Sequence, residues 1–440
     1  MLMYTDEELL DKLNEQNPWW VTDDVVLDDD IIERELESEI KDELDERIIT
    51  AIIGLRRTGK TTLLKQQIKR LLTDKKSKYI LYFSFDAMEK QDKAIRKIFQ
   101  LYHQHILKEV PSEFEERVFI FFDEVQKVKD WGEEIKSIWD RGYPVKFIVS
   151  GSSSMNILKG GGESLVGRIS LHRLYPFSFA EFLKYYGVQA DRLSCHDILE
   201  DEIKYPVNSG KIQVKFQEYL KTGGFPEILT KDKKKDYLND IVSLTFYRDI
   251  VTMLPVKRTE VLEGLFYHFI RESGQVINYN KLADSLNTKY ETVKDYIDHL
   301  ESSFLIERST LYSKNKLKSI RKNPKIYVAD HGFSILEKME KGLRVETAVY
   351  NHITRYHDVY YWKDRKELDL VVETKQKPIP IEVKFKEQIG KKDIKGLMDF
   401  MKKTDVEKGV VVTKKDYRTE TVDGKQIVYV PAWLFLLSEW

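Results

Sequence analysis

Short apolar runs alternate with amphipathic stretches over the first 175 residues. Four runs rich in β-branched and aromatic residues are predicted to be buried strands: RIITAIIG (47–54), YILYFSFD (79–86), RVFIFFDE (117–124) and VKFIVSG (145–151). Between them, apolar residues recur three or four positions apart, which indicates helices. RISLHRL (168–174) completes the series as a fifth strand. Strands that alternate with helices are typical of an α/β fold with a parallel sheet covered on both faces.

The pattern changes after Tyr175-Pro176. Residues 177–265 are predicted to be mainly helical, and residues 266–330 to form a small helical unit of the kind that binds DNA. Residues 345–430 return to a mixed α/β pattern. Ahead of the first strand, 5–16 and 30–46 are predicted to be helices, the second one highly charged.

The charge is divided unevenly along the chain. The 440 residues include 72 basic and 73 acidic side chains, yet residues 1–46 hold 18 acidic and only 3 basic ones. The remainder therefore carries 69 basic and 55 acidic residues, a net charge of +14. An acidic arm on a basic body suggests an anionic partner or an intramolecular mask. Trp19 and Trp20 are expected to pack this arm onto the core.

The cysteine count and the length of the apolar runs indicate the cellular compartment. Cys195 cannot form an internal disulfide, which fits a reducing environment. No apolar run approaches the ~20 residues needed to span a bilayer. We expect a cytoplasmic protein without a membrane partner.

GLRRTGKTT (54–62) matches the phosphate-binding pattern G-x-x-x-x-G-K-[ST], after a strand and at the start of a helix. The two glycines let backbone N–H groups surround a phosphate. Lys60 is expected to reach the β- and γ-phosphates, Thr61 to ligate Mg²⁺, and Thr62 to contact the α-phosphate. The predicted ligands are ATP and Mg²⁺, and the predicted nucleotide-binding residues are Gly54, Arg56, Arg57, Thr58, Gly59, Lys60, Thr61 and Thr62.

Asp123 and Glu124 end the third strand. The aspartate is expected to hold Mg²⁺ and the glutamate to act as general base for the attacking water. The gap between Lys60 and Asp123 leaves room for an intervening strand, which indicates the subclass with an extra strand between the two motif strands. In that subclass a polar residue at the tip of the extra strand senses the γ-phosphate, and the candidates are Ser150 and Ser152 in VSGSSS (149–154). Arg168 is a candidate arginine finger, acting in cis or in trans.

The chain resembles archaeal and bacterial AAA-type P-loop ATPases whose C-terminal half carries a winged helix and a restriction-endonuclease-like domain of the PD-(D/E)XK kind. The resemblance rests on the motifs above and on FFDEVQ (121–126), LVGRIS, LYPFSFAEF (174–182), TGGFPE (222–227), KIYVADHG (325–332), YYWKDRKELDLVV (360–372) and PIEVKF (380–385). After the acidic arm (1–46), the resemblance implies an ATPase core (47–185), a helical lid (186–265), a winged helix (266–335) and a nuclease-like domain (336–440).

In the winged-helix segment, Thr288 is expected to cap the second helix in a capping box with Glu291. The ribbon that follows, from Arg308 to Lys325, contains seven cations and no acid. Such a ribbon suits phosphate contacts, although a solvated loop or a protein-binding module fits the same pattern. The candidate nucleic-acid contacts are Lys314, Lys316, Lys318, Arg321 and Lys322.

In the last segment Asp369 lies on one strand and Glu382-Val383-Lys384 on the next, after a helix that bears Glu346. Glu382 and Lys384 face the same side of their strand, next to Asp369. Two carboxylates and a lysine are what metal-dependent phosphodiester hydrolysis needs. An active nuclease and an inactive structural domain both remain open.

These patterns favour an ATP-driven switch or motor that acts on DNA. Two alternatives remain: a signalling or scaffold ATPase whose C-terminal modules bind protein, and an ATP-gated metal-dependent nuclease. The oligomeric state is left open.

Overall fold

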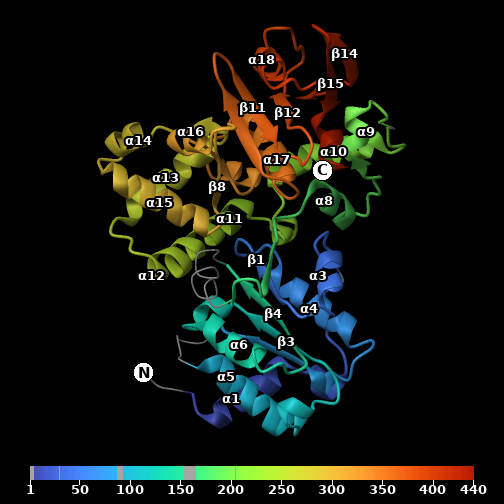
Figure 1. Ribbon diagram of the computed structural model, residues 1–440, viewed down its shortest axis with the longest axis vertical. Coiled ribbons are helices and arrows are strands. Elements are labelled where there is room, and N and C mark those ends of the chain that lie inside the picture. The colour runs from blue at the N-terminus through green and yellow to red at the C-terminus, as the bar shows by residue number, and fades with distance from the viewer. Residues whose placement is uncertain (1–3, 29, 87–92, 153–164, 204) are drawn as a thin grey trace. The chain divides into compact units, whose positions relative to one another are not determined.

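The computed structural model describes residues 4–28, 30–86, 93–152, 165–203 and 205–440. The chain divides after Leu174 into two compact units, coloured blue to cyan-green and green to red in Figure 1. Each unit has its own sheets and its own apolar core.

The first unit is built on a parallel sheet of five strands in the order β2-β3-β4-β1-β5. The strands are β1 (Ile49–Ile53), β2 (Ile80–Ser84), β3 (Val118–Asp123), β4 (Val145–Gly151) and β5 (Ile169–Arg173). All five predicted strands are present. Strand β4 lies between β1 and β3, which confirms the expected extra strand between the two motif strands.

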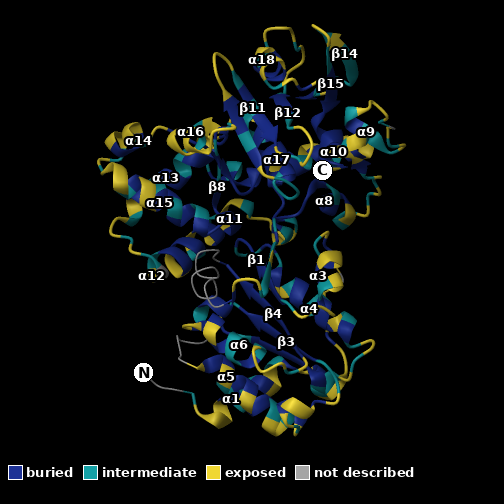
Figure 2. Cartoon of the chain, viewed as in Figure 1, coloured by how far each residue is buried: buried dark blue, intermediate teal, exposed yellow. Residues whose placement is uncertain are grey.

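Helices cover both faces of this sheet, so β3 is buried along its whole length (Figure 2). On one face, α4 (Lys60–Leu71) packs Leu63, Leu64 and Ile68 against Phe119 and Phe121 of β3. The helices α5 (Ala94–Leu101), which continues as a π-helical segment over Tyr102–Leu107, and α6 (Trp131–Trp139) belong to the other face.

The acidic arm contains α1 (Asp6–Gln16), α2 (Trp19–Thr22) and α3 (Glu37–Glu43). Thr5 caps α1 in a capping box with Glu8, close to the predicted start. The prediction of one helix over 30–46 is wrong, because only its second half is helical. Ahead of α3 the chain is fixed by contacts with α4: the carbonyl oxygen of Ile32 accepts from Gln66 Nε2 at 3.0 Å instead of serving a helical N–H.

Side chains of the arm cover the outer edge of the sheet. Asn17 Oδ1 accepts the backbone N–H of Tyr82 at 2.7 Å, and Asn17 Nδ2 donates to the Tyr82 carbonyl oxygen at 2.8 Å. The side-chain amide thus makes the hydrogen bonds that a neighbouring strand would make. The indole N–H groups of Trp19 and Trp20 both donate to the Ile80 carbonyl oxygen, at 3.1 and 2.9 Å. Gln16 Oε1 accepts the N–H of Ser84 at 2.7 Å. The expectation that the tryptophans pack the arm onto the core is confirmed.

The second unit contains a mixed sheet of six strands in the order β10-β11-β12-β13-β15-β14. Its strands are β10 (Val359–Lys363), β11 (Glu367–Val372), β12 (Ile379–Lys384), β13 (Lys408–Thr413), β14 (Arg418–Val422) and β15 (Lys425–Pro431). Strands β12, β13 and β15 run parallel, and the others pair antiparallel. One face is covered by α17 (Lys341–Ile353) and α19 (Ala432–Phe435), and the other by α18 (Lys395–Thr404).

The helices expected to form a lid share a core with this C-terminal sheet. Phe216 of α10 (Ser209–Thr222), from that segment, belongs to one apolar cluster with Val349 and Val410. Phe182 of α8 (Phe179–Tyr185) belongs to the same cluster, so α8 is part of the second unit and not, as predicted, of the ATPase core. The short α9 (Cys195–Leu199) follows β6 (Leu193–Ser194), which pairs with β16 (Ser438–Glu439). Within the second unit these helices therefore serve as part of the sheet's packing.

A third sheet, β7-β9-β8, is antiparallel. Helices and strands follow in the order α13 (Thr259–Arg271), β7 (Gln275–Val276), α14 (Tyr279–Ser285), α15 (Tyr290–Ser302), β8 (Ile306–Ser309), α16 (Lys316–Arg321) and β9 (Lys325–Val328). Helices α11 (Lys234–Leu244) and α12 (Val251–Met253) precede them. Two details differ from expectation. Lys289, not Thr288, is the N-cap of α15, and α16 interrupts the predicted ribbon because Asn315 accepts from the N–H groups of Leu317 and Lys318.

His352 of α17 gives the second unit a pH-dependent stability. It is fully buried, and its Nε2–H donates to the Ser438 carbonyl oxygen at 2.8 Å. Burial, together with the positive charges of Arg355 and Arg192, lowers its pKa to about 3. An unfolded histidine titrates near 6.5, so the unfolded chain binds the extra proton first as the pH drops.

We therefore expect this stabilisation to be complete above pH 6.5 and to weaken by about 2 kcal/mol at pH 5. Urea unfolding at pH 7 and pH 5 measures the change. A His352→Gln variant should lose less stability over this range than the natural protein. Equal losses in both proteins would contradict the assignment.

Candidate functional site

Two glycines shape the loop between β1 and α4. Gly54 has φ 151°, and a Cβ there would lie 2.4 Å from the carbonyl oxygen of Leu174. Gly59 has φ 98° and forms the N-cap of α4. The loop backbone thus requires glycine at both positions, and the first N–H groups of α4 point to the space where an anion would bind.

The ammonium group of Lys60 lies inside this loop. Its Nζ donates to the carbonyl oxygens of Gly54 at 2.9 Å and Leu55 at 3.0 Å, and the residue is 5% exposed. Thr58 Oγ1 donates to the same Leu55 oxygen at 2.9 Å. A positive charge is therefore held among backbone dipoles at the point where phosphate oxygens would approach.

Three hydroxyl groups converge on the buried Asp123. Its Oδ2 accepts from Thr61 Oγ1 at 2.6 Å and from the Tyr82 hydroxyl at 2.9 Å, while its Oδ1 accepts from Ser150 Oγ. Thr61 and Asp123, far apart in sequence, are thus in direct contact. Carboxylate and hydroxyl oxygens are the ligands that Mg²⁺ prefers, so this pair fits the predicted metal site.

Glu124 follows in a left-handed conformation, φ 55°, that turns it away from the strand. Its Oε2 accepts from Gln126 Nε2 and from Ser152 Oγ, the latter at 3.3 Å. Burial raises the pKa of Glu124, but the positive charges of Lys60 and Arg56 and these hydrogen bonds outweigh burial, and the net pKa is lowered. Glu124 is therefore an ionised carboxylate, the state that a general base needs.

The two serine candidates take different positions. Ser150 joins the two acids, because its hydroxyl donates to Asp123 and accepts the N–H of Glu124 at 3.2 Å. Ser152 contacts Gln126 and Glu124. Contact of either with a γ-phosphate stays a prediction. The last two serines of the motif, 153–154, lie outside the described residues.

Two further residues of this site were not found from the sequence. Arg34, in the acidic arm, donates from its guanidinium to the Thr58 carbonyl oxygen at 2.8 Å and is 6% exposed. Tyr82 holds Asp123 from β2. Arg34 is one of only three cations in the acidic arm, which was a usable signal, whereas a tyrosine in an apolar strand is typical of a core residue.

Arg168 lies at the amino ends of the strands, opposite the end that carries the phosphate loop. Its carbonyl oxygen accepts the N–H of Ile49 at the amino end of β1, while the phosphate loop follows the carboxyl end of that strand. Its guanidinium stacks on Trp139 and lies 3.5 Å from Asp140. The sequence-based option of an arginine finger in cis is therefore corrected. A role in trans stays a prediction.

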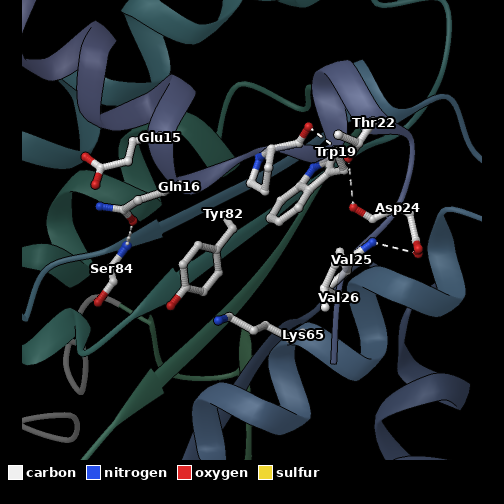
Figure 3. Close-up of a pocket in the computed structure, with 11 residues that line it drawn as sticks. Glu15, Gln16, Trp19, Thr22, Asp24, Val25, Val26, Lys65, Tyr82 and Ser84 are labelled. Atoms are coloured by element: carbon white, nitrogen blue, oxygen red, sulfur yellow. Dashed lines mark hydrogen bonds between the residues drawn. The ribbon is translucent and has the colours of Figure 1, made fainter. Parts of the chain in front are cut away.

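A pocket of about 690 Å³ adjoins this network on the Tyr82 side. Figure 3 shows Lys65 of α4 and Tyr82 of β2 extending toward the same space, below Trp19 and Val26. The residues that line the pocket include none from the loop 54–62. The Tyr82 ring lines the pocket while its hydroxyl binds Asp123, so one side chain joins the two sites.

Two of the seven cations between Arg308 and Lys325 are engaged within the protein. Arg308 pairs with Asp298 at 2.7 Å and with Glu301, and Lys325 is 1% exposed. The five candidate nucleic-acid contacts on and around α16 are all exposed: Lys314, Lys316, Lys318, Arg321 and Lys322. Leu317 and Ile320 of the same helix are exposed among them.

The four nuclease-like residues gather at one face of β11 and β12. Lys384 Nζ lies 3.0 Å from Asp369 Oδ2 and also pairs with Glu382. Glu346 accepts from the Tyr327 hydroxyl at 2.8 Å and pairs with Lys325 at 3.2 Å. Burial, with a contribution from Asp369, raises the pKa of Glu382 to about 8. The predicted clustering is present, but no group of three or more acidic, His or Cys side chains in the described part of the chain is arranged to hold a metal ion.

Comparison with known families divides the chain into three segments. Residues 46–183 match the family model described as "AAA domain", residues 213–340 match a domain of unknown function (DUF8612), and residues 341–433 match another (DUF4143).

Related proteins extend over most of the chain. An uncharacterised protein of Haemophilus influenzae is 27% identical over 405 residues, which cover 89% of this chain and 95% of the relative. An uncharacterised protein of Methanocaldococcus jannaschii is 27% identical over 413 residues, 89% of this chain and 88% of the relative.

Solved structures are similar at a lower level. The Aeropyrum pernix ORC1 protein in complex with DNA has a TM-score of 0.31 and 10% identity, over 76% of this chain and 97% of that one. AMPPCP-bound DnaA from Aquifex aeolicus has a TM-score of 0.27 and 18% identity, over 65% of this chain and 92% of that one. The AAA match and the sheet order together support an AAA-type P-loop ATPase domain in the first part of the chain. Among the described residues no helix is long and apolar enough to cross a membrane.

Proposed function

We propose that this protein is a Mg²⁺-dependent ATP hydrolase that works as a nucleotide-driven switch. The observation that carries the proposal is the contact between Thr61 and Asp123 at 2.6 Å, beside the ammonium of Lys60 and an ionised Glu124. A phosphate loop, two hard oxygen ligands and a general base are the parts that ATP hydrolysis requires.

Each residue has a task in this scheme. The N–H groups at the start of α4 bind the phosphates, and Lys60 turns its Nζ from the loop carbonyls to the β- and γ-phosphate oxygens. Thr61 and Asp123 would hold Mg²⁺, which supplies positive charge to the same oxygens. Glu124 orients a water molecule and takes its proton as the water oxygen bonds to the γ-phosphorus and the bond to the β–γ bridging oxygen breaks. Ser150 keeps Asp123 and Glu124 in register.

A phosphate-release assay tests the proposal. The purified full-length protein should hydrolyse ATP with Mg²⁺, and activity should disappear with EDTA and return when Mg²⁺ is added. Failure to bind ATP by equilibrium titration would refute the proposed site.

The target of the switch is proposed to be DNA. The unit made of α13–α15 and β7-β9-β8 follows the element order of a winged helix, and five exposed cations lie between β8 and β9. The exposed Leu317 and Ile320 among these cations give α16 an apolar contact as well. A protein-binding module remains the second candidate, because the same surface would suit an acidic protein partner.

DNA binding should depend on salt. Each phosphate contact lowers the slope of log K against log salt by about 0.9. In a Lys314/Lys316/Lys318→Ala variant the affinity for DNA should therefore depend less on salt, with a slope about 3 smaller in magnitude. Fluorescence-anisotropy titrations at several salt concentrations measure this slope. Lys231, Lys233 and Lys235 are also exposed in the second unit, and their replacement by alanine provides the matched control. Salt-independent binding, or no binding, would favour the protein-binding candidate.

A further inference from the structure

A buried lysine from outside the C-terminal sheet lies among the nuclease-like acids. Lys325 Nζ is 3.2 Å from Glu346 Oε1, 3.2 Å from Glu367 Oε1 and 3.9 Å from Asp369 Oδ1. Lys325 belongs to β9, whereas these carboxylates come from α17 and β11. One ammonium group thus meets carboxylates of two elements at the place where a nuclease of this arrangement would bind a divalent cation.

Lys325 is fixed in this position. Its strand, β9, is the central one of β7-β9-β8. Lys325 itself is paired with Val276 of β7 on one side and with Ser309 of β8 on the other. The residue is 1% exposed, and Ile326, Tyr327 and Val328 after it are completely buried. Tyr327, two positions along and on the same side of the strand, donates to the same Glu346 oxygen. The ammonium group is thus held inside the protein, and it cannot reach solvent unless the side chains packed around it move.

A second cation occupies the other side of the cluster. Lys384 Nζ pairs with Asp369 Oδ2 and with Glu382, and the backbone N–H of Val383 donates to Asp369 Oδ2 at 2.9 Å. Both oxygens of Asp369 therefore face lysine ammonium groups. Mg²⁺ and Mn²⁺ need several oxygens at about 2 Å from one point, and they repel a neighbouring ammonium strongly where water is excluded. With the Lys325 ammonium between Glu346, Glu367 and Asp369, the residues present do not fit a divalent ion at that point.

We infer that the ammonium of Lys325 takes the place of a divalent cation, so that the C-terminal sheet is a metal-free platform joined to the β7-β9-β8 unit by buried ion pairs. The cluster then fixes the position of the candidate DNA-binding unit on the sheet and does not cleave phosphodiesters. Removing Lys325 leaves Glu346, Glu367 and Asp369 without their shared cation. Glu382 shares its partner Lys384 with Asp369, and together these carboxylates then form a divalent-cation site.

Mn²⁺ binding to the nucleotide-free full-length protein tests the inference, by electron paramagnetic resonance and calorimetry. The natural protein should show no Mn²⁺ binding that Glu382→Gln removes. Lys325→Ala should gain one Mn²⁺ site, at least tenfold tighter than any at this place in the natural protein, and Lys325→Ala/Glu382→Gln should lose it. Lys322→Ala, an exposed lysine three residues earlier, should leave Mn²⁺ binding unchanged.

Breaking a buried ion network can impair folding, so a second readout is needed. Millimolar Mn²⁺ should raise the melting temperature of Lys325→Ala. Any shift that Mn²⁺ causes in the natural protein should be the same in Glu382→Gln. Glu382-dependent Mn²⁺ binding by the natural protein would overturn the inference. So would a Lys325→Ala variant that neither binds Mn²⁺ nor is stabilised by it.

Discussion

Replacement of Lys60 by alanine should lower ATP turnover at least 100-fold. The side chain supplies the positive charge inside the phosphate loop, and removal of one such transition-state contact typically costs 10²–10³ in rate. The substitution also removes the ammonium group that would turn from the carbonyl oxygens of Gly54 and Leu55 to the β- and γ-phosphates, so ATP affinity should weaken as well. Steady-state phosphate release and equilibrium binding of a fluorescent ATP analogue measure the two effects.

Lys69→Ala is the matched control for this variant. Lys69 lies on the same helix but is exposed, so its loss should leave turnover within twofold of the natural protein. Melting curves of both variants separate a catalytic effect from unfolding. A folded Lys60→Ala protein with natural turnover would mean that hydrolysis takes place elsewhere.

Glu124→Gln should separate ATP binding from hydrolysis. Glutamine keeps the shape of the side chain and an acceptor oxygen for Ser152, but it cannot take a proton from water. General-base catalysis contributes about 10²–10⁴ in rate, so single-turnover hydrolysis should slow by at least 100-fold while ATP still binds. Single-turnover measurements with excess protein report the chemical step directly.

The control is Glu133→Gln, an exposed acid at the start of α6. Its turnover should match that of the natural protein. If the Glu124 variant hydrolysed ATP normally, the base would have to be another group, and Asp123 would then be tested by its asparagine variant.

The nucleotide site was largely predictable because its signals are local. A glycine pair and Lys60 next to a strand define the loop, and an acid pair at the end of a second strand defines its partner. Strand β4 was placed correctly between these two strands because the spacing of the motifs indicated the subclass. Arg34 and Tyr82 were missed because their partners lie 24 and 41 residues away, and neither carries a local motif.

Other interpretations failed where the answer depended on tertiary partners. Residues 177–265 were correctly predicted to be mainly helical, but the apolar face of a helix does not reveal that α10 packs on the C-terminal sheet. Arg168 was proposed as an arginine finger from its neighbours in sequence. Because β5 runs parallel to β1 and Arg168 precedes β5, it lies at the end of the sheet away from the phosphate loop, which excludes a role in cis. Lys325 was counted among the seven cations suited to phosphate contacts, because nothing in a basic segment distinguishes the one side chain that is buried.

The arm that covers the edge of β2 also bears on the order of synthesis. Residues 16–20 leave the ribosome some sixty residues before the strand whose N–H and carbonyl groups they bond. When β2 emerges, its cover is already present, so the edge is never open to strands of neighbouring nascent chains. A chain that begins after the arm would expose this edge from the moment it folds, and its characteristic failure would be pairing between copies on the same polysome.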